Sequence, residues 1–269
     1  MVRFTNTRVL AQVVYSTLLG DKVLAAADSF ELSRYGLPVR GKNFPAAYAT
    51  GLLVGRRVLQ KLGLADTYKG NEQVDGEIKQ VESNKRTYFV EEVDEERRPF
   101  RCYLDVGLKR TSVGSRVFAA LKGASDAGLD IPHNSKNFLG YNRDDKKYDA
   151  DAHRAAIFGE PIKAYQEQLL EDDQESGTHR FDEVFGQYKK HGVGPDDLEE
   201  LYTKVHAAIR ADPSSKHKEP KKERSAKRKH TKKYAHPPRK TYEQRKKDIG
   251  EKMAKIKAAR GEQGEDVAE

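Results

Sequence analysis

The sequence predicts an α/β protein in the broad, α+β sense: a mixed β-sheet with packed helices in the order β-β-β-α-β-α, followed by a helical C-terminal extension and a basic tail. Three observations predict this class. Residues 2–27 have the composition of strands, two later segments have helical spacing between recognisable end signals, and only helical patterns follow residue 149. Strand and helix patterns in this order are typical of helices layered on a sheet.

The first strands are expected close to the start of the chain. The run Arg8–Ser16 is rich in β-branched and aromatic residues, which favour strands. Alternate residues from Val9 to Tyr15 should lie on one face. Gly20-Asp21 interrupts this run and Lys22–Ala27 resumes it, as in a hairpin. Val2–Thr5 is expected to form a preceding strand.

A helix should follow the three strands. Asn43 is suited to its N-cap and Pro45 to its first turn, while Gly63 is suited to its C-terminal stop. Gly51 and Gly55 are four residues apart, so they lie on one side of the helix. Their missing side chains are expected to allow close packing on a sheet.

The next segments are read as an excursion, a strand and a second helix. Residues Asp66–Pro99 are polar and acidic, with one strand-like patch at Thr87–Val90, and the sequence assigns them no function. Cys102–Val106 is expected to be a buried strand. The glycine-bounded loop Gly107–Gly114 leads from it to a helix over about Ser115–Ala127.

The remaining chain is read as helices and a tail. A helix should begin at Pro195, because acids fill its first turns and Arg210 lies near its end, which suits the helix dipole. Residues 216–235 contain almost no large apolar side chain and are expected to be disordered alone. Thr241–Arg260 could be helical, without a convincing apolar face. The expected domains are therefore 1–145, a helical extension over 146–213, and a tail over 214–269.

The charge is concentrated in the tail. The chain is 36% apolar and 34% charged, with a net charge of +8. Residues 216–260 hold 19 Lys and Arg against 5 Asp and Glu, whereas residues 1–215 carry a net charge of −2. A near-neutral body joined to a strongly basic tail is typical of a protein that binds a polyanion such as nucleic acid.

Several classes of protein are disfavoured. The single cysteine, Cys102, excludes an internal disulfide and fits a reducing compartment, and neither a membrane-spanning run nor a secretory signal is found. The histidines lack metal-ligand spacing, the carboxylates occur in runs, and no nucleophile elbow or P-loop is present. We therefore expect no catalytic residues, no metal, no cofactor, no membrane partner and no enzymatic activity.

The loop after the expected fourth strand is the first candidate site. It supplies three bases and three hydroxyls within a strand–loop–helix segment, where backbone N–H groups and the helix dipole favour anions. Several backbone phosphates of a nucleic acid suit it best; a plain surface turn and a small-molecule phosphate site are the alternatives. Its candidate residues are Lys109, Arg110, Thr111, Ser112, Ser115 and Arg116.

Two further clusters are candidates. The end of the first strand offers the donors Arg3, Thr5, Asn6, Thr7 and Arg8, and a simple β-turn with solvated arginines explains them equally well. In the tail, bases can neutralise phosphates and interleaved tyrosines can stack on exposed nucleobases. A solubilising or nuclear-localisation run is the alternative there. The tail candidates are Lys222, Arg224, Lys227, Arg228, Lys229, Lys232, Lys233, Arg239 and Lys240.

Several stretches in order along the chain resemble one known family. They are Val2–Thr7, Tyr35–Pro38, Ala46–Leu53, Cys102–Leu108, Val117–Ala124, Ile131–His133 and His206–Arg210. They are similar to those of the 5S-rRNA-binding proteins of the large ribosomal subunit, the universal L-eighteen family, number five in eukaryotes. The resemblance covers about residues 1–213, and the tail matches in character only.

The resemblance implies a structural constituent of the large subunit that binds 5S rRNA and anchors it in the central protuberance. It implies RNA contacts from the matched residues Arg3–Arg8 and Lys109–Arg116, and adds Lys42 and Asn43. The expected partners are 5S rRNA, large-subunit rRNA, the other 5S-associated ribosomal protein, neighbouring large-subunit proteins and nuclear import factors. The expected location is the cytoplasmic ribosome, after nuclear and nucleolar passage during assembly.

One departure and two rival hypotheses remain. Members of the family carry a basic arm before the first strand, and Met1 stands where that arm should end, so the chain is expected to lack it. A nuclear chaperone or adaptor could instead use the basic tail on nucleic acid and the acidic surfaces on proteins. An enzyme that binds a nucleotide at Gly107–Gly114 is the third hypothesis.

Overall fold

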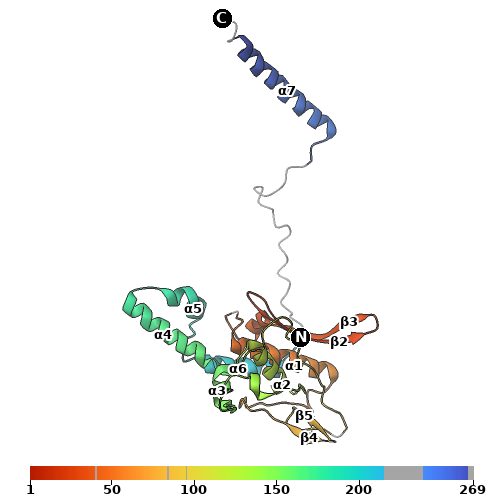
Figure 1. Ribbon diagram of the computed structural model, residues 1–269, viewed down its shortest axis with the longest axis vertical. Coiled ribbons are helices and arrows are strands. Elements are labelled where there is room, and N and C mark those ends of the chain that lie inside the picture. Colours follow the sequence, from red (N-terminus) through yellow and green to blue (C-terminus); the bar gives the residue numbers. More distant parts are fainter. Residues whose placement is uncertain (40, 84, 95, 215–238, 266–269) are drawn as a thin grey trace. The chain divides into compact units, whose positions relative to one another are not determined.

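The computed structural model describes residues 1–39, 41–83, 85–94, 96–214 and 239–265. The chain divides into two compact units, Met1–Lys216 and His217–Glu269. The first unit combines a small sheet with helices, which confirms the α+β class, and the second contains the helix α7 (Tyr242–Glu265) (Figure 1). The predicted disorder of residues 216–235 lies outside the described residues. No helix in the described parts of the chain is long and apolar enough to cross a membrane.

The first strands form an antiparallel sheet of three, β1 (Val2–Phe4), β2 (Val9–Thr17) and β3 (Gly20–Asp28). The predicted hairpin is present, but the chain reverses at Leu18-Leu19, so that Gly20 already belongs to β3. The register shifts between Val13 and Val14. Before this irregularity β2 is anchored in the core, whereas beyond it the strands leave the core and Tyr15 is 48% exposed.

The first long helix, α1 (Phe44–Leu62), begins and ends as the sequence predicts. The Asn43 side chain accepts a hydrogen bond from the N–H of Ala46 at 3.0 Å, and Gly63 adopts the left-handed conformation. The glycine side of α1 packs on the second helix, α2 (Arg116–Asp126), rather than on the sheet. A Cβ at Gly51 would lie 2.0 Å from the carbonyl oxygen of Ala120, so the two backbones touch and a side chain is excluded.

The strand predicted between these helices, Cys102–Val106, is not formed. Residues 102–106 are extended and their alternate side chains pack on the core, but they pair with no strand of the sheet. Within the described residues a single backbone bond joins this segment to the sheet, from the Val2 N–H to the Asp105 carbonyl at 2.9 Å, and the Arg3 guanidinium donates to the same carbonyl at 3.0 Å. One backbone bond does not make a ladder. The sheet is accordingly antiparallel instead of mixed.

A separate hairpin lies within the acidic excursion, formed by β4 (Val81–Ser83) and β5 (Arg86–Tyr88). Its second strand, β5, overlaps the strand-like patch predicted at Thr87–Val90. The two 3₁₀ segments, η1 (Ser29–Tyr35) and η2 (Ser135–Asn137), precede α1 and follow α2 respectively.

The helical extension contains four helices, α3 (Ala150–Phe158), α4 (Glu160–Ser176), α5 (Arg180–Lys190) and α6 (Leu198–Ala211). The predicted helix from Pro195 is α6, which begins three residues later. Its residues Tyr202, Val205 and Ile209 are fully buried in the main core. By contrast, α4 and α5 form a small separate core together with Leu198 of α6, and they project from the body (Figure 1).

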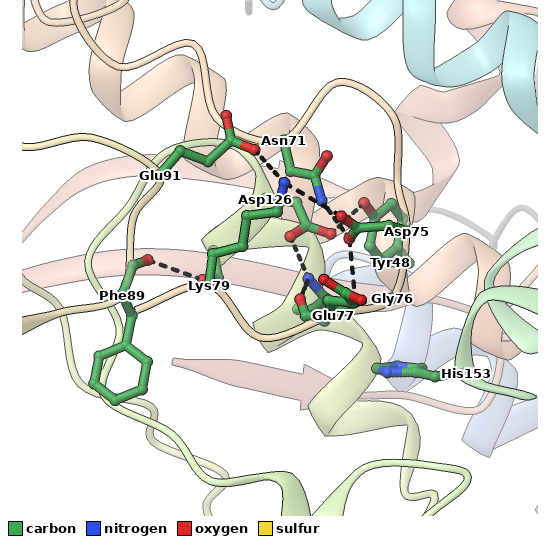
Figure 2. A network of polar contacts seen from close by, with 12 residues as sticks. Tyr48, Asn71, Asp75, Gly76, Glu77, Lys79, Phe89, Glu91, Asp126 and His153 are labelled. Carbon is green, nitrogen blue, oxygen red and sulfur yellow. Dashed lines mark hydrogen bonds and ion pairs between the residues drawn. The ribbon is translucent and has the colours of Figure 1, made fainter. Parts of the chain in front are cut away.

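A polar network ties the acidic excursion to α1 and α2 (Figure 2). The Lys122 ammonium group donates to Asp126 at 2.5 Å and to the carbonyl of Glu77 at 2.7 Å. Tyr48 donates to the same Asp126 carboxylate at 2.7 Å, and Lys79 bridges Asp75 and Glu91. These bonds hold the excursion to the helices, which gives its polar residues a structural role.

Candidate nucleic-acid interface

The first unit brings three of the sequence-predicted clusters together around the N-terminus of α2. The Arg116 guanidinium lies 4.9 Å from the ring centroid of Phe4 and donates to the carbonyl of Lys42 at 2.6 Å. A Cβ at Gly107 would lie 2.8 Å from Cζ of Arg3. The end of β1, the residues before α1 and the loop 107–116 are therefore neighbours in space.

The turn after β1 is held by a threonine. The Thr5 hydroxyl accepts the N–H of Arg8 at 3.0 Å and donates to its carbonyl at 3.1 Å. Asn6 and Thr7 are exposed at the tip. Thr5 has a structural task here, and the amide and hydroxyl of the next two residues are the donors that face solvent.

The two arginines of this cluster are paired within the chain. Arg3 lies 2.6 Å from the Asp105 carboxylate, and Arg8 lies 2.7 Å from that of Asp28. Bonds from Arg3 and from the Gly107 N–H keep the pKa of Asp105 below its usual value. The turn is present, and its two arginines pair with carboxylates of the chain while their side chains stay 37% and 43% exposed.

The loop after residue 106 exposes its cations. Gly107 and Gly114 both adopt positive φ, 61° and 72°, a conformation that glycine tolerates best. Between them Lys109 and Arg110 are exposed, and neither enters an ion pair found within the described ranges. Thr111 and Ser112 are exposed beside them, as is the neighbouring Leu108. These two bases are the charges most available to an external anion.

Three candidates at this site have structural tasks. Asn43 caps α1, and its amide also donates to the Tyr202 hydroxyl at 3.4 Å. The Lys42 carbonyl accepts a hydrogen bond from Arg116. The half-buried Arg116 side chain thereby connects the start of α2 to the residues before α1 and, through Phe4, to β1. Arg116 thus differs from Lys109 and Arg110 of the same loop, which are exposed. Ser115 occupies the N-cap of α2 without a side-chain capping bond.

Most tail candidates fall outside the described residues, namely Lys222, Arg224, Lys227, Arg228, Lys229, Lys232 and Lys233. Of the other two, Arg239 is exposed and Lys240 pairs with Asp248 at the start of α7. The Lys240 carbonyl also accepts a hydrogen bond from the Arg245 guanidinium at 3.1 Å.

One exposed aromatic near this site was not among the predicted residues. Tyr103 is 74% exposed on the extended segment that leads to the loop. Cys102 and Leu104 on either side of it face the core, so the alternation of the segment was the available signal. An exposed ring beside cations can stack on an unpaired nucleobase.

The features needed for catalysis are not assembled in the part of the chain that the structure describes. No group of three or more His, Cys, Asp or Glu there could hold a metal ion. Burial raises the pKa of the Cys102 thiol to about 11, so it stays protonated and is a poor nucleophile. A hollow of about 670 Å³ is lined by the acidic excursion, including Glu72, Glu91 and Glu92, instead of the glycine-bounded loop.

Comparison with known proteins gives two family matches. Residues 1–134 match the family described as "Ribosomal large subunit proteins 60S L5, and 50S L18". Residues 198–258 match the "Ribosomal L18 C-terminal region". The second match extends well past residue 213, where the resemblance read from the sequence ended, so the likeness of the tail is more than one of character.

Individual relatives agree with these family matches. A large ribosomal subunit protein uL18 of Oryza sativa subsp. indica is 46% identical over 261 residues, which cover 97% of this chain and 79% of the relative. The uL18 of Dunaliella salina is 49% identical over 85% of this chain and 79% of its own length. That of Saccharomyces cerevisiae is 48% identical over 82% and 70%. The chain therefore belongs to the uL18 family of large ribosomal subunit proteins, which are structural proteins and not enzymes.

Proposed function

We propose that this protein is a structural constituent of the large ribosomal subunit that binds 5S rRNA and anchors it in the central protuberance. The observation that supports it most is the convergence of three polar clusters around the N-terminus of α2. Family membership supplies the ribosomal context. The proposed RNA contacts are those of the sequence-predicted residues, led by the exposed Lys109 and Arg110.

The charge distribution sets how this interface would work. Residues 1–215 carry a net charge of −2, so the body exerts little long-range attraction on RNA. Binding by this unit then depends on local groups: two exposed cations, the hydroxyls of Thr111 and Ser112, and the turn donors Asn6 and Thr7. Phosphate contacts of this kind fix position and orientation without reading sequence, which suits a protein that anchors a folded RNA.

The basic tail would add affinity. Residues 216–260 hold 19 basic residues, and each phosphate that they neutralise releases counterions and strengthens binding at low salt. We also propose large-subunit rRNA, the other 5S-associated ribosomal protein and neighbouring subunit proteins as partners. The same basic residues could be bound by nuclear import factors, which would account for nuclear passage before the protein reaches cytoplasmic ribosomes.

Replacement of the resident uL18 in a cell tests the proposal. A tagged copy of this chain should sediment with large subunits in a gradient, and 5S rRNA should co-purify with it when the particles are dissociated. A chaperone or adaptor would instead bind RNA in the light fractions and be missing from mature subunits. That outcome would reject a constituent role.

A further inference from the structure

The helix α7 has a start that is encoded locally. The Thr241 N–H donates to the Gln244 side chain at 3.0 Å, and the Gln244 N–H is 3.4 Å from the Thr241 hydroxyl. This reciprocal pair is a capping box, which satisfies two N-terminal N–H groups without help from another element. The position at which the helix begins is therefore fixed by its own residues.

One face of α7 carries an apolar stripe. Tyr242, Ile249, Met253 and Ile256 follow one another at intervals of seven, four and three residues, which places them on one side of a helix. Their exposed fractions are 76%, 61%, 51% and 50%. The stripe is narrow and surrounded by bases, which is why the sequence analysis found no convincing apolar face here.

The charges of α7 are arranged around the stripe. At 3.6 residues per turn, Arg245 and Lys252 flank it on one side, and Lys246 and Lys257 flank it on the other. Glu251 lies on the opposite side of the helix. The stripe is thus bordered by positive charge along both edges.

We propose that α7 docks lengthwise, through this stripe, in an apolar groove of a neighbouring protein whose rims carry carboxylates. Amphipathic helices bind grooves in this way through anchors spaced three, four and seven residues apart. The basic borders select acidic rims and repel basic ones. The inference rests on the proposed function in one respect, namely that the partner is a protein of the large subunit.

The aliphatic stripe favours a protein over RNA as the occupant. A helix in an RNA groove would have phosphates beside its basic edges, but Ile249, Met253 and Ile256 would cover base edges. Those edges lose water and gain no hydrogen bond from an aliphatic side chain. An apolar groove loses nothing when the same side chains cover it, since both surfaces gain from leaving water.

Photo-cross-linking within assembled subunits tests this inference. The full chain would carry benzoylphenylalanine in place of either Met253 or Glu251, and large subunits containing it would be irradiated. The expected result is a cross-link from position 253 to one protein, at a peptide that lines an apolar groove rimmed by Asp or Glu. Position 251, on the opposite face, should give at most one tenth of that yield.

Other outcomes overturn the inference. RNA-only cross-links from position 253, or none in subunits that contain the chain, would show that the stripe does not bind a protein. Failure of the chain to enter large subunits would reject the proposed function and this inference with it, and the gradient distinguishes the two cases.

Two variants separate docking from helix formation. Ile249→Ala with Ile256→Ala keeps the helix, because alanine has the highest helix propensity, and it should reduce the cross-link from position 253 at least tenfold. The control Glu243→Ala with Glu251→Ala changes exposed residues away from the stripe, outside the basic set proposed to contact RNA, and should leave the yield unchanged. Equal yields from the two variants would contradict docking through the stripe.

Discussion

The polar network of Figure 2 and the loop 107–116 use the same residue types in opposite ways. In the network, Lys122 is bonded to a carboxylate and a backbone carbonyl, and both it and Asp126 are at most 4% exposed. In the loop, Lys109 and Arg110 are exposed. The first lysine has its partners inside the chain, and the loop cations require one from outside.

This contrast shows that the role of a charged residue depends on which groups the fold places beside it. Removing a residue of the network should lower stability, while removing a loop cation should lower only RNA affinity. Arg116 is intermediate, since it lies next to the loop and yet contacts Phe4 and the Lys42 carbonyl. The predictions below test the contrast from the largest effect to the smallest.

Among the substitutions, Lys122→Ala should give the largest loss of stability. It leaves the Asp126 carboxylate buried without its cation, and breaking a buried pair in this way typically costs about 3–5 kcal/mol. Urea denaturation of the full chain, followed by circular dichroism, measures the loss. The matched control is Lys204→Ala, which breaks an exposed i,i+4 pair with Glu200 and should hardly change the midpoint. Similar midpoints for both variants would contradict the assigned role of the network.

Acidification should lower the stability of the folded chain through its buried histidines. Burial lowers the pKa of His133 to about 4, and those of His153 and His206 to about 3. Below about pH 6.5 these histidines are protonated in the unfolded chain but stay neutral in the folded chain. The free energy of unfolding should therefore fall as the pH drops from 6.5 to about 4, by up to about 1.4 kcal/mol per pH unit for each histidine.

A variant identifies the groups responsible. His206 is enclosed by Tyr48, Phe158 and Tyr202, and His206→Gln removes one titrating ring. The readout is the slope of stability against pH, because this substitution also lowers the absolute stability. The slope between pH 6 and 4 should become shallower by about one proton; an unchanged slope would mean that His206 does not titrate as its burial requires.

Arg116→Ala should have a smaller effect on stability. It removes the contact with the Phe4 ring and the hydrogen bond to Lys42, which together are expected to contribute about 1–2 kcal/mol. Thermal melts of Arg116→Ala and Arg116→Lys check this value. The lysine variant keeps the charge but loses the planar guanidinium, so it should recover only part of the loss. If Arg116→Ala is as stable as the unchanged protein, Arg116 has no structural role and is a free cation like Lys109 and Arg110.

Features determined by nearby residues could be predicted from the sequence. Asn43 and Gly63 delimit α1 as expected, because a helix cap is built from residues within a few positions of each other. Residues 102–106 were misjudged because strand formation depends on a partner, and here only one backbone bond, from Val2 to Asp105, joins the segment to the sheet within the described residues. The contact of Arg116 with Phe4 joins residues more than a hundred positions apart in the sequence, and no local pattern indicates it.

The candidate site also has a part that the sequence predicted and a part that it could not predict. The sequence located the loop 107–116 from its glycines, bases and hydroxyls, and the structure shows Lys109 and Arg110 exposed. It could not distinguish these two from Arg3 and Arg8, whose carboxylate partners lie far along the chain at Asp105 or across the sheet at Asp28.

The most direct test of the account is the affinity of the full chain for 5S rRNA, measured at several salt concentrations against a shuffled RNA of equal length. The account predicts preference for 5S rRNA. Lys109→Gln with Arg110→Gln should weaken that binding about tenfold, or 1.4 kcal/mol, and flatten the dependence of log K on log salt by about 0.9 for each lost phosphate contact. The control Lys85→Gln with Arg86→Gln removes the same charge from the exposed β4–β5 hairpin and should preserve the affinity. Equal weakening by both variants, or equal affinity for the two RNAs, would contradict the account.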